Sequence, residues 1–188
     1  MGNRFMIALA TYFLLTQPYI LPADAHRFLA ECRSNGIVIG KVIKNCNTEN
    51  DSECCEPNRS YPKYYCSPPV TSNTQATMTL NSFVKGGDGG DKPACGNYHA
   101  DTEMVVALST GWYNWGSRCN KNIRIHGKGR SVLAKVVDEC DSRAGCDAVH
   151  AYQPPCHNNI VDASKAVWNK LGYKGDEIGE AKITWSDA

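Results

Sequence analysis

Ten cysteines constrain the fold of this 188-residue chain more than any other feature of its sequence. In an exported protein an even number of cysteines favours five disulfides over reduced thiols, although spacing alone leaves the pairing open. A boundary just after Cys66 leaves five cysteines on each side. At least one bridge then has to cross the boundary unless two thiols stay free, so we expect two parts that are stapled together. The ten are Cys32, Cys46, Cys54, Cys55, Cys66, Cys95, Cys119, Cys140, Cys146 and Cys156.

Residues 1–25 have the pattern of a secretory signal. Arg4 precedes an apolar run, residues 5–15, and Ala23-Asp24-Ala25 provides small residues for a signal peptidase. The apolar run is too short for a membrane span. We expect cleavage after Ala25 and a secreted mature chain, and the alternative is an N-terminal anchor that stays attached.

Composition and motifs exclude several ligand classes. Lys and Arg number 20 and Asp and Glu number 19, so the chain lacks the basic excess that nucleic-acid binding requires. The five histidines show no ligand spacing, and oxidised cysteines do not bind zinc, so we expect no metal and no cofactor. The glycine-rich segment 85–92 lacks the ending of a phosphate-binding loop. Asp88 and Asp91 could bind a calcium ion between them, but a plain solvated loop is the favoured interpretation of this segment. Separately, Asn50 and Asn58 each begin a sequon for N-glycosylation.

The first part of the mature chain, residues 26–66, is a cysteine-rich module. It is too small to build a core of its own, so disulfides have to stabilise it. Short apolar stretches at 37–39 and 42–43 predict a minimal hairpin. The adjacent Cys54 and Cys55 are expected to form disulfides with two different parts of the chain, as in a knotted mini-domain. Residues 67–69, which include two successive prolines, are expected to be an extended linker.

The second part, residues 67–188, is predicted to be a compact closed β-barrel with about six strands and one short helix. The one confident helix is expected to begin after Asp162 as its N-cap and to end at Gly172. Residues 132–137 are mostly apolar without Gly or Pro, which favours a central strand covered on both faces. A closed barrel hides its strand edges and needs only one helix to cover an end. Strands are expected at 76–83, 104–113, 122–126, 132–137 and 182–185.

The segment 138–150, which we call the acidic loop, follows the central strand directly. It carries four carboxylates, Asp138, Glu139, Asp141 and Asp147, among cysteines that pin it down. Carboxylates on a pinned loop form either a rigid binding surface or a reaction site. For Asp138 the structural alternative is a carboxylate that accepts backbone N–H groups at the barrel end.

Three aromatic residues, Trp112, Tyr113 and Trp115, lie at the end of the predicted strand 104–113. Exposed aromatic rings stack on sugars or anchor a protein partner. The alternative is that these rings cover the end of a small core.

Four long segments occur in order along the second part: CSPPVTSNTQATMTLNSFVKGGDGGDKPAC, VVALSTGWYNWGSRC, VVDECDSRAGCD and QPPCHNNIVDASKAVWNKLG. Together they resemble the kiwellins, also called ripening-related proteins. The resemblance implies a secreted plant protein with a double-psi β-barrel, the fold shared with barwin and the expansins. It also implies a role in defence or ripening in the apoplast or cell wall, with some members binding and inhibiting enzymes that pathogens secrete.

Enzymatic relatives of this barrel supply a rival hypothesis. Asp138 and the following residues resemble the strand-end Asp-x-Cys of expansins, and Asp162 falls where expansins and small endoglucanases carry the general acid of His-Phe-Asp. Glycosidic cleavage normally needs two carboxyl groups, which Asp138 and Asp162 would supply across a common groove. However, Ile160 replaces the motif's histidine, and no base is evident on the first strand.

The sequence therefore predicts a non-enzymatic, disulfide-stapled, secreted protein that binds a protein partner, with a pathogen-secreted enzyme as one such partner. Alternatives are binding of cell-wall polysaccharide and weak glycan cleavage by Asp138 and Asp162. The predicted partner-binding residues are Trp112, Tyr113, Trp115, Asp138, Asp141, Asp147 and His150.

Overall fold

The computed structural model describes residues 32–41 and 45–188. The predicted signal segment, its cleavage site and the second half of the 37–43 hairpin lie outside these residues. These described residues form one compact unit. All ten cysteines pair, as expected, in the bridges Cys32–Cys66, Cys46–Cys54, Cys55–Cys146, Cys95–Cys119 and Cys140–Cys156.

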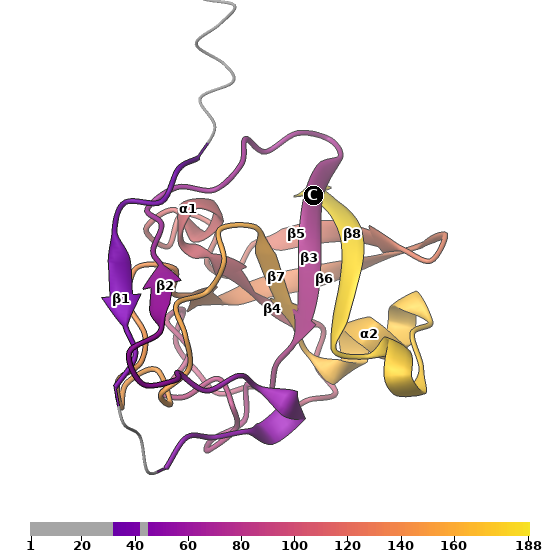
Figure 1. Cartoon of the computed structure of the whole chain (residues 1–188). Coiled ribbons are helices and arrows are strands. Elements are labelled where there is room, and N and C mark those ends of the chain that lie inside the picture. Colours follow the sequence, from indigo (N-terminus) through magenta and orange to yellow (C-terminus); the bar gives the residue numbers. More distant parts are fainter. Residues whose placement is uncertain (1–31, 42–44) are drawn as a thin grey trace, which may run out of the picture. The chain divides into compact units, whose positions relative to one another are not determined.

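Six strands close into a barrel in the order β3-β7-β4-β6-β5-β8 (Figure 1). Two neighbouring pairs are parallel, β3 with β7 and β4 with β6, and the other four are antiparallel. The predicted mainly-β, six-stranded double-psi barrel is therefore confirmed. Its strands are β3 (Thr74–Leu80), β4 (Val105–Ser109), β5 (Asn122–Gly127), β6 (Arg130–Cys140), β7 (Ile160–Ala163) and β8 (Glu180–Asp187).

The barrel interior is the main hydrophobic core. Each strand contributes alternate residues to it, because successive side chains of a strand point to opposite faces. On β6 the inward residues Val132, Ala134 and Val136 are buried, whereas Leu133 and Lys135 are exposed. The expectation that this strand is covered on both faces is wrong for residues 133–135, where the outer face meets solvent. It holds at Val137, which packs with Phe83 and Ala107 in a smaller cluster outside the barrel. Fully buried side chains of the core include Met78, Leu108, Ile123, Ile125, Val161 and Trp185.

Two short α-helices accompany the barrel. The strand predicted for 104–113 ends at Ser109, and the chain turns into α1 (Thr110–Tyr113). Helix α2 (Lys165–Leu171) ends at Gly172, whose φ of 90° suits a glycine at that position, as predicted. The N-cap position is occupied by Ser164, so the prediction that Asp162 caps this helix is wrong. Among the described residues, no helix is long and apolar enough to cross a membrane.

The cysteine-rich module has a two-stranded sheet in which β1 (Ile37–Ile39) pairs with β2 (Ser60–Pro62). The partner of 37–39 is therefore a later segment than predicted, and a 3₁₀ turn, η2 (Glu49–Asp51), lies between the two strands. Cys46–Cys54 is nested inside Cys32–Cys66, so these two bridges do not interlock as a knot.

The junction between the module and the barrel is tightly packed. The Trp112 indole N–H donates to the Pro68 carbonyl at 2.8 Å. A Cβ atom at Gly111 would lie 2.1 Å from the Ser67 nitrogen, so only glycine permits this approach. The bridge Cys55–Cys146 adds a covalent link, which confirms the predicted crossing disulfide. Residues 67–69 are thus a packed segment rather than a free linker.

Candidate binding surface

A shift in register at the end of β6 places Asp138 on the outer face of the barrel. Val106 of β4 pairs with Val136, but the next residue, Ala107, pairs with Asp138, so Val137 is the extra residue of a β-bulge. The simple alternation of β6 would direct Asp138 toward the core. Instead, Asp138 Oδ1 accepts the backbone N–H groups of Ala94 and Glu139, both at 2.8 Å.

Asp138 and Asp162 stand in one row across four strands. Thr79 of β3 pairs with Asp162 of β7, and Ala107 of β4 pairs with both Asp162 and Asp138. Residues paired in this way carry their side chains on the same face. The two backbones are two strand spacings apart, about 10 Å. The structure therefore brings the two carboxylates to one outer face, as the glycan-cleavage hypothesis requires.

Both carboxyl groups hold their protons more firmly than an ordinary aspartate. Burial raises the pKa of Asp162 to about 7, and the negative charges of Asp88 and Asp138 add to this effect. Asp162 also accepts a hydrogen bond from Thr79 Oγ1 at 2.5 Å, which lowers the pKa of Asp162 and so opposes the effect of burial. Burial also raises the pKa of Asp138 to about 6, against the two backbone donors. Below about pH 6 both groups favour the acid form, so the pair then lacks the ionised partner that glycosidic cleavage needs.

Asp88 connects this region with the cysteine-rich module. It is buried, with 3% of its surface exposed, rather than part of a solvated loop as expected. Its carboxylate accepts the Ser82 backbone N–H at 2.8 Å and the side chains of Asn50 and Ser52 at 3.1 and 3.0 Å. These donors satisfy the carboxylate with protein groups in place of a calcium ion.

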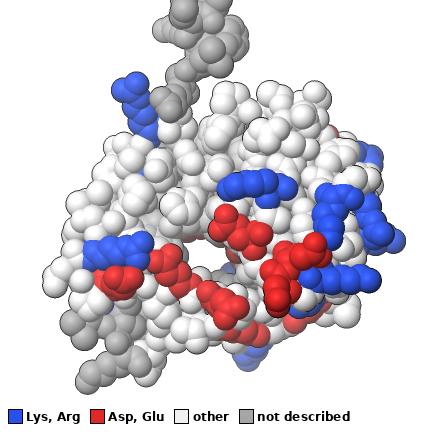
Figure 2. All heavy atoms as spheres, turned by 45° about the vertical axis from the view of Figure 1, so that its right-hand side comes forward, with Lys and Arg blue, Asp and Glu red and all other residues white. Residues whose placement is uncertain are grey.

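On one face of the molecule, acidic side chains gather around a hollow (Figure 2).

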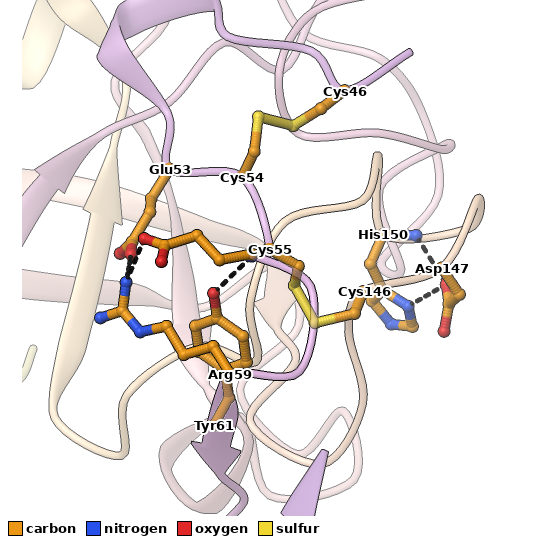
Figure 3. The surroundings of a disulfide bond; sticks show 10 residues. Cys46, Glu53, Cys54, Cys55, Arg59, Tyr61, Cys146, Asp147 and His150 are labelled. Atoms are coloured by element: carbon orange, nitrogen blue, oxygen red, sulfur yellow. Dashed lines mark hydrogen bonds and ion pairs between the residues drawn. A yellow bond between two sulfur atoms is a disulfide. The ribbon is translucent and has the colours of Figure 1, made fainter. Parts of the chain in front are cut away.

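The acidic loop is held by two disulfides. Cys140–Cys156 closes its base, and Cys146 joins it to Cys55 of the module (Figure 3). Backbone hydrogen bonds reinforce the junction, from Cys55 to the Tyr152 carbonyl at 3.1 Å and from Cys146 to the Gln153 carbonyl at 2.7 Å. The loop is consequently fixed near its start, at Cys140, and in its middle, at Cys146.

His150 lies between two carboxylates of this loop. Its Nδ1 is 2.6 Å from Asp147 Oδ1, and its Nε2 is 3.5 Å from Asp141 Oδ2. Asp141 is less exposed than Asp147, so solvent screens its charge less, although it lies farther away. Asp141 first, and then Asp147, raise the pKa of His150 to about 9. The imidazolium in turn holds the pKa of Asp141 below its usual range, together with Arg143, although burial opposes this shift.

Arg143 forms a second cluster with an exposed tryptophan. Its guanidinium lies 3.2 Å from Glu139 and 3.3 Å from Asp141, with its carbon 5.5 Å from the centre of the Trp115 ring. Thr110 donates to Glu139 at 2.6 Å and fixes that carboxylate. Asn114 and Trp115 both have left-handed backbones, with φ of 48° and 54°. Trp115 is 84% exposed, so a strained turn presents a large apolar ring to solvent.

A pocket of about 80 Å³ lies beside this cluster. Of the residues that line it, only Trp115 was among the predicted partner-binding residues, and the prediction did not include Tyr65 or Arg143. Tyr65 comes from the module, and only the folded chain brings it next to the barrel. Arg143 had one sequence signal, because it is the only Lys or Arg in the acidic loop. The pocket is lined by Tyr65, Thr110, Gly111, Asn114, Trp115, Glu139 and Arg143.

The three predicted aromatic contacts separate into two groups. Trp112 and Tyr113 are buried, with 1% and 8% of their surfaces exposed, and belong to the barrel core. Trp112 packs edge-on against Trp185 with ring centres 5.1 Å apart. The alternative, that these rings cover the end of a small core, describes both residues. Of the three, only Trp115 remains available to a partner.

Fold and surface together define a small β-barrel protein stapled by disulfides, with a rigid acidic loop beside an exposed aromatic pocket. The chain belongs to the kiwellin family, because the Kiwellin-1 family model matches residues 14–188.

Relatives from three plants agree with this assignment. Ripening-related protein 3 of Oryza sativa subsp. japonica is 52% identical over 171 residues, which are 87% of this chain and 79% of the relative. Ripening-related protein grip22 of Vitis vinifera is 62% identical over 136 residues, 71% of this chain and 61% of the relative. Kiwellin of Actinidia chinensis var. chinensis is 60% identical over 132 residues, 69% of this chain and 62% of the relative.

Similarities to solved structures are weaker. The expansin of Clavibacter michiganensis has 22% identity and a TM-score of 0.45, over 62% of this chain and 50% of the expansin. The Streptomyces papain inhibitor has 21% identity and a TM-score of 0.42, over 63% of this chain and 96% of the inhibitor. Neither similarity assigns a ligand to this chain.

Proposed function

We propose that this kiwellin is a secreted, non-enzymatic plant protein that binds a partner protein, such as an enzyme secreted by a pathogen. The binding surface consists of the pocket residues Tyr65, Trp115 and Arg143 and the adjoining acidic-loop residues Asp141, Asp147 and His150. The observation that carries the proposal is the exposed Trp115 ring, held by a left-handed turn and by Arg143 beside a preformed pocket.

The residue types of this surface favour a protein partner. Trp, Tyr and Arg are the side chains that most often dominate binding energy at protein interfaces, typically around a central pocket. The loop that carries Arg143 is fixed by Cys140–Cys156 and Cys55–Cys146. A surface that is rigid before binding loses little conformational entropy in the complex, which favours tight association.

The net charge of the acidic loop indicates which kind of partner surface it would bind. The acidic loop carries four carboxylates against one arginine and one histidine, so a negative charge remains even when His150 is protonated. A complementary partner surface would therefore be basic, and attraction between the two would speed association at low salt. Its affinity is expected to fall at high salt, because the screening length decreases from about 10 Å at 0.1 M to about 3 Å at 1 M.

The test uses the wild-type protein and Trp115→Ala, each immobilised and exposed to proteins secreted by plant pathogens. Each retained protein is purified, and its affinity is measured by calorimetry at low and high salt. We expect Trp115→Ala to weaken binding roughly tenfold or more, as at interface hot spots. Leu133→Ala, which truncates another exposed apolar side chain on the barrel, is the matched control. Equal affinities of wild type and Trp115→Ala would contradict the proposal.

Glycan cleavage is the second candidate, because Asp138 and Asp162 share one outer row. The two backbones are about 10 Å apart, and such a spacing allows the side chains to approach the roughly 6.5–9.5 Å that separates the carboxyl groups of inverting glycosidases. Reducing-sugar release from plant and fungal wall polysaccharides tests this candidate. Release by the wild type that disappears in Asp162→Asn would establish Asp162 as an acid catalyst and contradict a purely binding role. No release by either folded protein would support binding alone.

A further inference from the structure

Between Asn122 and Lys135, the outer face of the β5–β6 hairpin carries basic side chains and no acidic ones, and the nearest acidic residues of β6, Asp138 and Glu139, lie beyond the end of β5. From residue 104 to residue 137 the chain has no Asp or Glu. Along β5 the outward residues are Asn122, Arg124 and His126, and all three are exposed. Their partners on β6 are Lys135, Leu133 and Ser131, which are also exposed.

The register arranges two cations and one histidine as a line along the hairpin. Lys135 pairs with Asn122 in the first row, Arg124 pairs with Leu133 in the second, and His126 pairs with Ser131 in the third. Outward residues on one strand repeat about every 6.8 Å, because two residues separate them at about 3.4 Å each. The line therefore presents Lys135, Arg124 and His126 at successive outward steps.

The acidic groups nearest to this hairpin are already engaged or lie at its margins. Asp187 pairs with Arg118 at 2.8 Å, and Lys128 at the hairpin turn contacts Glu177. Glu103 is near enough to Lys135 to interact with it weakly, but it hydrogen-bonds His99 and Ala100. Within the described residues, Arg124, Arg130, His126 and Lys135 have no acidic partner within 4 Å.

Neutral hydrogen-bonding groups extend the same face onto β8 and β3. Arg124 pairs with Ser186, His126 pairs with Thr184, and Thr184 pairs with Gln75. Leu133, 43% exposed, adds an apolar contact in the middle of the face. Cations, hydroxyl groups and one apolar side chain are together complementary to a polymer that carries anions and hydroxyl groups.

The line of cations ends at an open hollow. It measures about 420 Å³ and is lined by His126, Gly127, Gly129, Arg130 and Ser131 at the turn of the hairpin. Two glycines in this lining leave the backbone accessible. The Arg130 guanidinium packs over Gly172, at the C-terminal end of α2, and this contact holds the side chain in place. A bound chain could therefore follow the hairpin and end in the hollow beside a positioned arginine.

We propose that this face, which we call the cationic hairpin face (Arg124, His126, Arg130, Lys135 with Leu133 and Ser131), binds a linear acidic polysaccharide whose charges are uronate carboxylates. Arg124 and Lys135 contact successive carboxylates, Arg130 holds a carboxylate in the hollow, and the neutral side chains bond sugar hydroxyl groups. This site is separate from the pocket that contains Trp115 and acts on a different class of ligand. One protein could then be retained on an acidic polysaccharide while its acidic loop binds a partner.

Nucleic acid fits the cationic hairpin face less well. Single-stranded nucleic acids require aromatic platforms on which bases stack. Among the outward residues of the hairpin between Asn122 and Lys135, the side chains are basic, polar or aliphatic, and none is aromatic. A uronate polymer carries hydroxyl groups that the serine and threonine side chains of this face can bond.

The experiment measures binding of the full-length protein to polygalacturonate, with fully methyl-esterified polygalacturonate as the neutral form of the same backbone. The test variant is Arg124→Gln with Lys135→Gln. The matched control is Lys85→Gln with Lys92→Gln, which removes the same charge from the exposed glycine-rich loop. All four substitutions are at exposed side chains, and thermal unfolding verifies that both variants fold.

We expect the wild type to bind polygalacturonate, but not its ester, with an affinity that falls as salt increases. The test variant should lose roughly five- to tenfold in affinity, as expected from two exposed ionic contacts. The control variant should bind like the wild type. No binding to polygalacturonate, equal losses in both variants, or tighter binding to single-stranded DNA of equal charge would each overturn the proposal. Trp115→Ala should leave this binding unchanged, which separates it from partner binding.

Discussion

The guanidinium carbon of Arg143 lies 5.5 Å from the centre of the Trp115 ring, which is the one ring of the four tryptophans that solvent reaches freely. Trp112, Trp168 and Trp185 are all at most 1% exposed. Cation–π contact with Arg143 stabilises the ring by about 0.5–1 kcal/mol at an exposed site. The arrangement keeps an apolar side chain in water, where a partner can cover it.

This difference in exposure predicts how tryptophan fluorescence responds to iodide. Iodide is expected to quench one component, from Trp115, and to leave the emission of the three buried rings nearly unchanged. In Trp115→Phe the quenchable component should disappear. The free energy of unfolding should change by less than about 0.5 kcal/mol, because the side chain is on the surface. Quenching in Trp115→Phe that equals wild type would mean that another tryptophan is exposed.

Removal of the Cys55–Cys146 bridge should cost more stability than removal of Cys46–Cys54. The two bridges span 91 and 8 residues. The longer loop loses more entropy when closed, and the logarithmic dependence on length gives a difference of about 2 kcal/mol in the free energy of unfolding. We would compare Cys55→Ser/Cys146→Ser with Cys46→Ser/Cys54→Ser by denaturant unfolding without reductant. Equal losses would show that strain or unfolded-state structure outweighs loop length.

Asp162→Asn should stabilise the protein at alkaline pH. The pKa of Asp162 is raised to about 7, so between pH 4 and pH 7 the folded state keeps a proton that the unfolded state releases. The free energy of unfolding therefore falls as pH rises through this range. At about 1.4 kcal/mol for each pKa unit, we expect the variant to be more stable by about 2–4 kcal/mol at pH 8.

The same variant provides an internal check at low pH. Below pH 4 the wild-type carboxyl group is protonated in both states, so the two proteins should have similar free energies of unfolding. Asp176→Asn, which changes an exposed carboxylate, is the control and should alter stability little at either pH. Unfolding curves of Asp162→Asn that track wild type at pH 4 and pH 8 alike would contradict the burial of this group.

His150→Gln should destabilise the protein below neutral pH and lose that effect above pH 9. The pKa of His150 is raised to about 9, so its ion pairs stabilise the folded state fully below pH 6.5 and weaken as pH rises through 9. Because the imidazole is partly exposed, we expect a loss of about 1–2 kcal/mol at pH 6. Thermal unfolding from pH 5 to pH 10 measures this loss of stability, and His157→Gln, at an exposed histidine, is the control. A loss that stays constant through pH 10 would indicate packing rather than charge.

Local patterns in the sequence were sufficient for the barrel and for several of its parts. Alternation of apolar residues located β3, β5 and β8, and Gly172 located the end of α2, because strand alternation and helix termination depend on nearby residues. Parity of the cysteines predicted a bridge across residue 66. The proportion of strands to helix favoured a closed barrel, and the kiwellin resemblance specified it as a double-psi barrel.

The position of Asp162 shows where local patterns failed. Its sequence context, an aspartate before an alanine-rich stripe, is typical of an N-cap, yet β7 continues through Ala163 because Asp162 pairs with Thr79 and Ala107. Strand pairs formed with residues more than fifty positions away override the local preference. Trp112 and Trp115 likewise share one sequence motif, but the turn at Asn114 sends one ring into the core and the other to solvent.

The sequence by itself thus determined the disulfide-stapled barrel and the residue types available at its surface: an acidic loop, a group of aromatic residues and a run of cations. Tertiary structure decided which of them act together. The bulge at Val137 brought Asp138 into the row of Asp162, and Cys55–Cys146 brought Tyr65 of the module beside Trp115 and Arg143. Register, bulges and long-range bridges depend on contacts between distant segments, and a local pattern cannot specify them.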